Sequence, residues 1–116
     1  MDETKLHELV GRFLQDLGGA FSVPLVQIGE KLGLYKAIQE SGPCSAESLA
    51  SSTNLSARYL QEWLAAQAAS GYISYDPTTR AFSMTPEQAY ILADSGSPFY
   101  LAPAFGAAAA FQGNES

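Results

Sequence analysis

Few side chains in this sequence could take part in chemistry. Among its 116 residues the chain has one histidine, His7, and one cysteine, Cys44. His7 lies among polar neighbours, and no serine, cysteine or carboxylate pair is arranged around it as a catalytic base would require. Cys44 has no cation beside it in the sequence that would lower its pKa, which favours a small buried side chain over a nucleophile. We therefore expect no catalytic residue in this chain.

The sequence also has no recognisable site for a metal or a cofactor. One cysteine and one histidine cannot form a four-ligand metal site without several carboxylates. A nucleotide-type cofactor needs a glycine-rich loop after a strand, but Gly18-Gly19 follows an amphipathic helix and Gly106 lies among alanines. We expect neither a metal nor a cofactor to bind this chain itself.

Charge and composition narrow the range of partners. Twelve acidic and six basic residues give a net charge of −6, so the chain as a whole repels nucleic acid and anionic membrane surfaces. Residues 95–114 are nearly uncharged, but prolines and glycines interrupt them, whereas a spanning helix needs about 20 continuous apolar residues. The single cysteine suits a reducing compartment, and the N-terminus lacks the apolar stretch of a signal peptide. We expect a cytoplasmic chain without a membrane span.

The N-terminal third predicts two helices. Apolar residues recur at helical spacing from Thr4 to Leu17, and Gly18-Gly19 is expected to end this amphipathic helix. Residues 20–32 are apolar on most sides, which predicts a second, buried helix, with Pro24 tolerated in its first turn if Ser22 caps it.

Residues 34–94 show the pattern of a winged helix-turn-helix. A short helix at 34–38 is followed by helices that Ser45 and Ser56 can cap. Alternating residues at 72–75 and 81–84 then predict a hairpin, and Thr85-Pro86 with Gln88 opens another helix. The fold class expected is mainly α with a small β-hairpin, a winged helix-turn-helix preceded by N-terminal dimerisation helices.

Trp63 is the largest side chain of the second helix in this helix-turn-helix. It shares one helix face with Leu60 and Leu64, which favours a core anchor over a ligand-stacking residue. A buried indole N–H needs one hydrogen-bond acceptor.

Several stretches resemble a known protein family. Residues 28–38 (IGEKLGLYKAI) and 45–50 (SAESLA) are similar to the N-terminal domains of class I S-adenosylmethionine-dependent methyltransferases that act on small molecules. Residues 59–64 (YLQEWL), 70–76 (SGYISYD) and 84–89 (MTPEQA) resemble the branch in which this helix carries Glu-Trp-Leu and a Pro-Glu pair follows the wing. These motifs consist of packing and capping residues.

The resemblance, which covers residues 17–94, implies a role in a larger enzyme. In that family the domain dimerises through its first helices and lies over the substrate pocket, while a following domain binds S-adenosylmethionine. It thus implies a homodimer, a small-molecule acceptor, and a cofactor held by the full-length parent. Residues 1–33 would be dimerisation helices, 34–94 the winged helix-turn-helix, and 95–116 a linking helix toward an absent domain.

The apolar residues near the two ends exceed what one small core requires, and a helix-exchanging homodimer would cover them. The residues expected in the dimer interface are Leu6, Phe13, Leu17, Phe21 and Leu25. Phe99 and Tyr100 are expected to face the substrate, because clefts at domain junctions favour aromatic walls.

A winged-helix transcription regulator is the alternative. The second helix of the helix-turn-helix offers Arg58 against Glu62, and the wing offers Arg80 against Asp76. So few cations make a poor phosphate clamp, and nucleic acid is the less favoured partner. A plain interaction module for another protein is the third reading.

Overall fold

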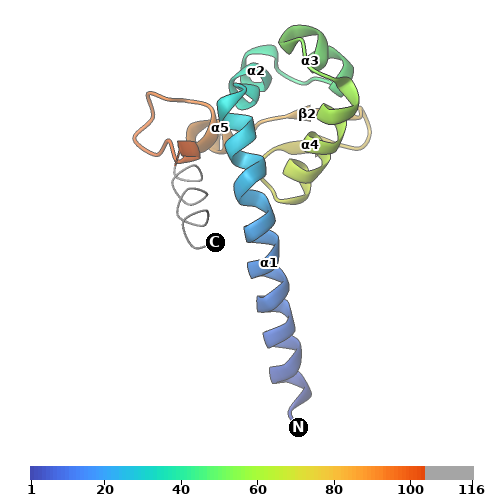
Figure 1. Cartoon of the computed structure of the whole chain (residues 1–116), viewed down its shortest axis with the longest axis vertical. Helices are drawn as coiled ribbons and strands as arrows, with labels where there is room; N and C mark the ends of the chain where they lie inside the picture. Colours follow the sequence, from blue (N-terminus) through green and yellow to red (C-terminus); the bar gives the residue numbers. More distant parts are fainter. Residues whose placement is uncertain (104–116) are drawn as a thin grey trace.

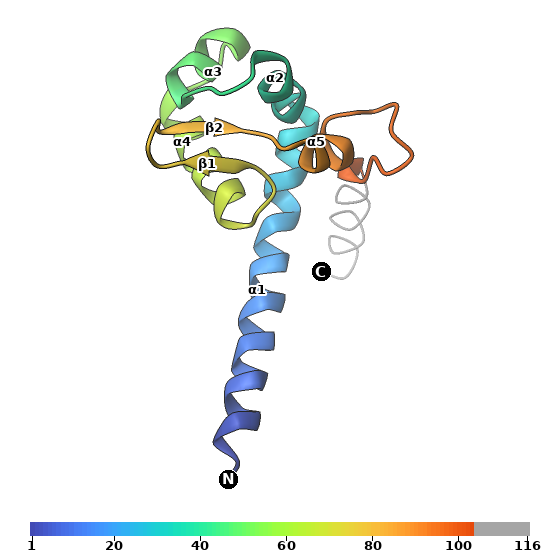
Figure 2. The same cartoon turned by 180° about the vertical axis from the view of Figure 1, so that it is seen from behind.

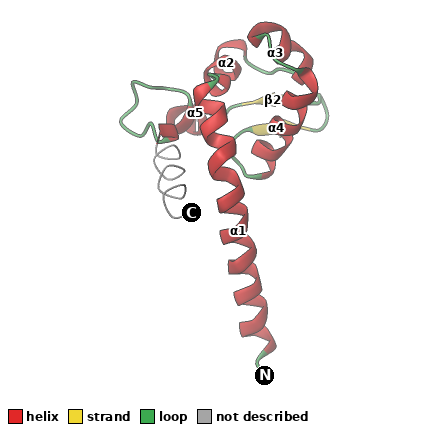
Figure 3. Ribbon diagram, viewed as in Figure 1, coloured by secondary structure: helices red, strands yellow, loops and turns green. Residues whose placement is uncertain are grey.

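The computed structural model describes residues 1–103, except for the side-chain surroundings of residues 18 and 21. It is mostly helical with one small antiparallel hairpin, which confirms the predicted fold class (Figure 3). The elements are α1 (Glu3–Lys31), α2 (Leu34–Ser41), α3 (Ala46–Thr53), α4 (Ala57–Ala69), β1 (Ser74–Asp76), β2 (Ala81–Ser83) and α5 (Pro86–Leu92). Most of the linking helix expected at 95–116 lies outside the described residues.

Helix α1 is continuous, so the prediction of two helices broken at Gly18-Gly19 was wrong. It is capped by Asp2, whose carboxylate accepts hydrogen bonds from the amides of Thr4 at 3.0 Å and Lys5 at 3.2 Å. Gly18 and Gly19 together cost the helix about 2 kcal/mol relative to alanines. Tertiary packing of the later turns outweighs that cost.

Pro24 lies inside α1, not in the first turn of a separate helix, and Ser22 is therefore not a cap. An interior proline removes one amide donor and costs about 3 kcal/mol. The next turns supply the compensation: Val26 is fully buried, and the indole N–H of Trp63 donates to the carbonyl of Leu25 at 2.9 Å. Packing against the rest of the protein therefore keeps α1 helical across the proline.

The capping predictions for the later helices are confirmed. The hydroxyl of Ser45 accepts from the amide of Ser48, and that of Ser56 accepts from the amide of Tyr59. Thr85 forms a reciprocal capping box with Gln88, and proline follows in the first turn. These caps fix the starts of α3, α4 and α5 and hence the turns between the helices.

The hairpin forms the wing beside α4 (Figure 2). Tyr75 pairs with Phe82 in an antiparallel register, and their rings pack with centroids 4.8 Å apart. Cys44, just before α3, forms an isolated bridge with Phe82, so the hairpin is joined to the helix-turn-helix by backbone hydrogen bonds. Cys44 itself is buried, as the sequence predicted.

The core gathers around Trp63, which confirms its predicted role as an anchor. Trp63 is 2% exposed, and its ring packs against that of Tyr35 with centroids 5.3 Å apart. Gly29 of α1 faces both rings: a methyl group there would lie 2.5 Å from Cζ2 of Trp63 and 2.7 Å from Cε2 of Tyr35. Only a residue without a side chain lets α1 approach the core this closely.

We predict opposite outcomes for two Gly→Ala changes in α1. Gly29→Ala should lower the free energy of unfolding by about 1–3 kcal/mol, because the methyl group overpacks the two rings. Gly11→Ala, where nothing lies within 4 Å, should be neutral or stabilising by at most about 1 kcal/mol. Equal urea-denaturation midpoints for the two variants would contradict the close approach.

Candidate functional site

The first half of α1 projects beyond the rest of the molecule, with no other described element beside it (Figure 1). The radius of gyration, 15.9 Å, accordingly exceeds the roughly 13–14 Å of a compact domain of this length. An apolar stripe nevertheless runs along this half and is 39–65% exposed. The α1 stripe comprises Leu6, Leu9, Val10, Phe13, Leu14 and Leu17. A contiguous apolar surface of this kind marks an interaction site.

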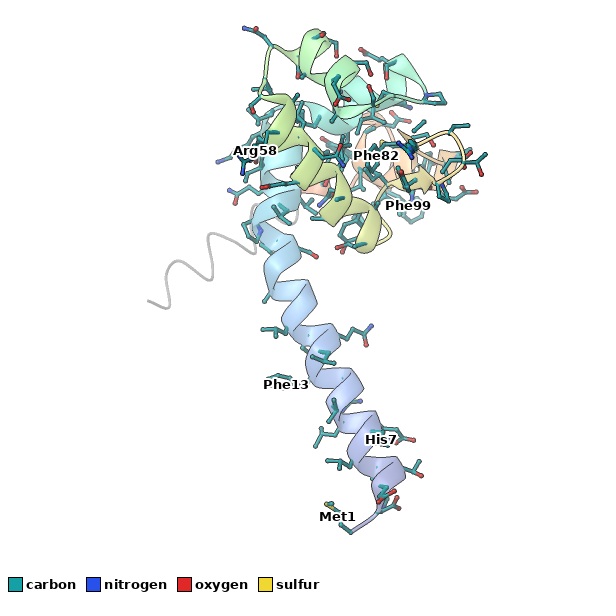
Figure 4. The ribbon with its side chains drawn as sticks, turned by 90° about the vertical axis from the view of Figure 1, so that its right-hand side faces the viewer. Met1, His7, Phe13, Arg58, Phe82 and Phe99 are labelled. Atoms are coloured by element: carbon teal, nitrogen blue, oxygen red, sulfur yellow. The ribbon has the colours of Figure 1, made fainter. Side chains whose placement is uncertain are left out.

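The residues predicted for a dimer interface fall into three groups. Leu6, Phe13 and Leu17 belong to the α1 stripe, and Phe13 lies on the projecting rod far from the body (Figure 4). Leu25 is half-buried and packs against the core of its own chain. The side chain of Phe21 lies outside the described part of the structure.

His7 is exposed on the projecting half of α1.

A second apolar surface surrounds α5. An open groove of about 490 Å³ runs between this helix and the loop that follows it. The α5 groove is lined by Pro86, Glu87, Tyr90, Ile91, Phe99 and Leu101. The amide of Leu101 donates to the carbonyl of Ile91 at 2.8 Å, and the rings of Tyr90 and Phe99 have centroids 5.9 Å apart. The loop is therefore held against the helix, and the groove is part of the fold.

Phe99 and Tyr100, the residues predicted to face a substrate, are not brought together. Phe99 is 59% exposed and lines the α5 groove. Tyr100 is half-buried against the core, and both burial and the nearby carboxylate of Glu30 raise the pKa of its phenol. Phe99 lies in a turn that the hydrogen bond from the Tyr100 amide to the Ser97 carbonyl closes, and the two side chains leave this turn in different environments.

The part of the groove that α5 provides was not predicted from the sequence. Tyr90 is 43% exposed and Ile91 is 38% exposed. A second hollow of about 340 Å³ also uses Ile91 and extends toward Gly71. The usable signal was that adjacent Tyr90 and Ile91 cannot both face the core, because one residue turns a helix by about 100°.

The outward side of α4 carries little positive charge. Arg58 lies exposed at the start of the helix (Figure 4), while Gln61 and Ala65 line a shallow hollow beside the wing. Arg80 occupies the left-handed turn of the wing with φ 59° and is also exposed. This face lacks the series of cations that phosphate contacts require.

One polar pair lies within the core. The phenol of Tyr35 donates a hydrogen bond to Oε1 of Gln67, while Nε2 of Gln67 finds no partner within residues 1–103. Burial, with a smaller effect of the Tyr72 phenol, raises the pKa of Tyr35 above its ordinary value. A buried phenol with a raised pKa holds its proton at neutral pH, so this pair is structural and does not act as a base.

The described residues give no sign of a bound group. No three histidine, cysteine, aspartate or glutamate side chains within residues 1–103 are grouped to hold a metal ion. The α5 groove is apolar except for Glu87 and has no glycine-rich loop, so it does not fit S-adenosylmethionine. No helix of the described chain is long and apolar enough to cross a membrane.

Two helices joined by a turn and followed by a hairpin define a winged helix-turn-helix domain. The model of the Rv2258c-like winged HTH domain matches residues 20–94. The chain belongs to that family. A comparison with curated proteins found no matching sequence.

Several solved structures that match this fold are described as methyltransferases. PigF with SAH superposes with a TM-score of 0.71 at 18% identity, covering 87% of this chain and 29% of PigF. The mitomycin 7-O-methyltransferase MmcR superposes with a TM-score of 0.65 at 25% identity, covering 85% of this chain and 31% of MmcR. An O-methyltransferase family protein from Burkholderia thailandensis superposes with a TM-score of 0.65 at 18% identity, covering 98% of this chain and 31% of that protein. The chain spans less than a third of the length of each of these proteins.

We predict alkaline destabilisation that depends on Tyr35. The pKa of Tyr35 in the folded chain lies above the ordinary value of 10.0. Its contribution to the free energy of unfolding is therefore complete below pH 10.0 and is lost as the pH rises further. Tyr35→Phe should reduce the loss of unfolding free energy between about pH 9 and about pH 11. Cys44 and Tyr100 are shifted in the same direction, so part of the loss will remain.

Tyr59→Phe is the matched control, because Tyr59 is 40% exposed. Urea denaturation at both pH values should show that this control loses as much unfolding free energy as the unchanged chain. The same loss in Tyr35→Phe would contradict the assignment.

Proposed function

We propose that this chain is the dimerisation and substrate-capping domain of an S-adenosylmethionine-dependent methyltransferase and has no catalytic activity alone. The observation that carries the proposal is the α1 stripe, which is exposed on a helix that is otherwise firmly anchored. An isolated monomer would present this apolar surface to water. The proposed dimer forms through residues 4–32, and a reducing cytoplasm suits its single buried thiol.

The methyl donor would bind in the remainder of the parent protein. The matched methyltransferases are more than three times the length of the part that this chain covers, and one of them is described with SAH. The described residues of this chain have no loop that would hold such a cofactor. The methyl-transfer chemistry is therefore assigned to a separate domain.

In the parent enzyme the domain would form a roof over a small-molecule acceptor. Its contribution would be to position the acceptor and exclude water, not to transfer protons. The exposed Phe99 and the α5 groove are the best-placed apolar surface at the end of the described chain. Tyr100 would act behind Phe99, by packing this segment against the core.

A DNA-binding regulator is the second candidate, and the winged helix-turn-helix fold is the observation that favours it. Binding through the few cations of this chain would be weak and readily lost in salt. Fluorescence anisotropy with duplex DNA distinguishes the two proposals. Salt-sensitive binding that Arg58→Ala abolishes would support the regulator, and no binding at low salt would exclude it.

We predict that the chain is a dimer at tens of micromolar, with a mass twice the 12.3 kDa of one chain in light scattering. Phe13→Glu should raise the dissociation constant by roughly 10–100-fold, because it places a charge in the apolar contact. Gln15→Glu is the control on the opposite side of α1 and should change little. A clean monomer at these concentrations would refute dimerisation through α1.

A further prediction concerns the parent protein. The intact mass of the native gene product from its source cells should lie well above 12.3 kDa, because about 70% of each methyltransferase it resembles lies outside the matched part. Mass spectrometry of the endogenous protein measures this directly. A mass that matches this chain would remove the capping role and favour DNA or protein binding.

A further inference from the structure

The apolar side of α1 extends beyond the stripe. Steps of four and three residues alternate along the helix from Leu6 to Pro24. We name this row the α1 seam: Leu6, Val10, Phe13, Leu17, Ala20 and Pro24. Every member is exposed in the structure. This alternation is the spacing with which two helices pack side by side in a coiled coil.

The seam faces away from the core of its own chain. Among the described side chains in the second half of α1, the buried residues are Ser22, Val26 and Gly29. Because one residue turns the helix by about 100°, Pro24 lies on the side opposite Val26. Beyond Pro24, Ile28 is half-buried and Leu32 is 47% exposed. A partner helix can therefore lie along the projecting half and continue past the anchored half.

Charges at the two ends of α1 select the orientation of such a partner. Glu3 is acidic at the start, Lys31 is basic at the end, and both are exposed. Lys5 near the start is basic, and the half-buried Glu30 near the end is acidic, so this second pair has the opposite order of charges. In a parallel pair each residue would meet its own copy, and all four contacts would join like charges. In an antiparallel pair Glu3 meets Lys31, and Lys5 meets Glu30, within one helical turn.

We propose that α1 pairs antiparallel with α1 of a second copy along this seam, with Glu3 of each copy beside Lys31 of the other. This inference rests on the proposed dimerisation and deepens it by naming the paired surface and its direction. The two helices overlap over nearly their full length of about 43 Å. Each copy covers the other's projecting half, and the two winged-helix bodies lie at opposite ends of the pair. Antiparallel helix dipoles add to the preference.

Crosslinking tests the direction. Leu6→Cys and Ile28→Cys are made separately in a Cys44→Ala background, mixed, treated with a short bismaleimide, and mapped by peptide mass spectrometry. Links between position 6 and position 28 are expected. Leu6→Cys alone should not link to itself, because its two copies lie about 33 Å apart. Self-linking of Leu6→Cys, or a dimer without the 6–28 link, would overturn the antiparallel seam.

A charge swap tests the end contacts independently. Glu3→Lys should raise the dimer dissociation constant by about 3–30-fold, because two attractive pairs become repulsive. Adding Lys31→Glu in the same chain should restore it, and Glu8→Lys serves as a control away from the seam. Failure of the second change to rescue the first would contradict the pairing. A monomer in sedimentation at every concentration would instead refute the proposed dimerisation itself.

Discussion

The close approach of Gly29 to the rings of Trp63 and Tyr35 is the contact on which the rest of the architecture depends. It joins α1 to the helix-turn-helix, and the hydrogen bond from the Trp63 indole to the carbonyl of Leu25 fixes the helix in rotation as well as in position. Because α1 is one continuous helix, fixing its last turns decides where the first turns point. They extend away from the core, and their apolar side remains in contact with water.

Two apolar surfaces result from this arrangement, and they are of different kinds. The α1 stripe lies on a single helix with no described neighbour, and the proposed dimer would cover it with a helix of similar length. The α5 groove is a concave surface built by a helix and a loop that the Leu101–Ile91 hydrogen bond holds together. The first suits association between chains, and the second suits contact with a neighbouring domain or a small molecule. The α1 stripe is wholly apolar, whereas Glu87 and the Tyr90 phenol are the polar groups of the α5 groove.

Much of this fold could be predicted from the sequence, because local signals decide it. Ser45, Ser56 and Thr85 each cap the helix that follows, and Trp63 is the anchor that its helix face indicated. The continuity of α1 could not be predicted, since Gly18-Gly19 and Pro24 are local breaking signals that tertiary packing overrides. The α5 groove was also missed, because it arises where the loop folds back on Tyr90 and Ile91, and no local pattern shows that return.

The most direct test of this account is hydrogen exchange in α1, measured by mass spectrometry over a range of protein concentrations. Amides around Val26 should be protected at every concentration, because the core holds that part of the helix. Amides from Lys5 to Leu17 should exchange quickly in dilute solution and become protected as the concentration rises. Fast exchange of this segment at every concentration would show that nothing covers the α1 stripe and would contradict an association helix.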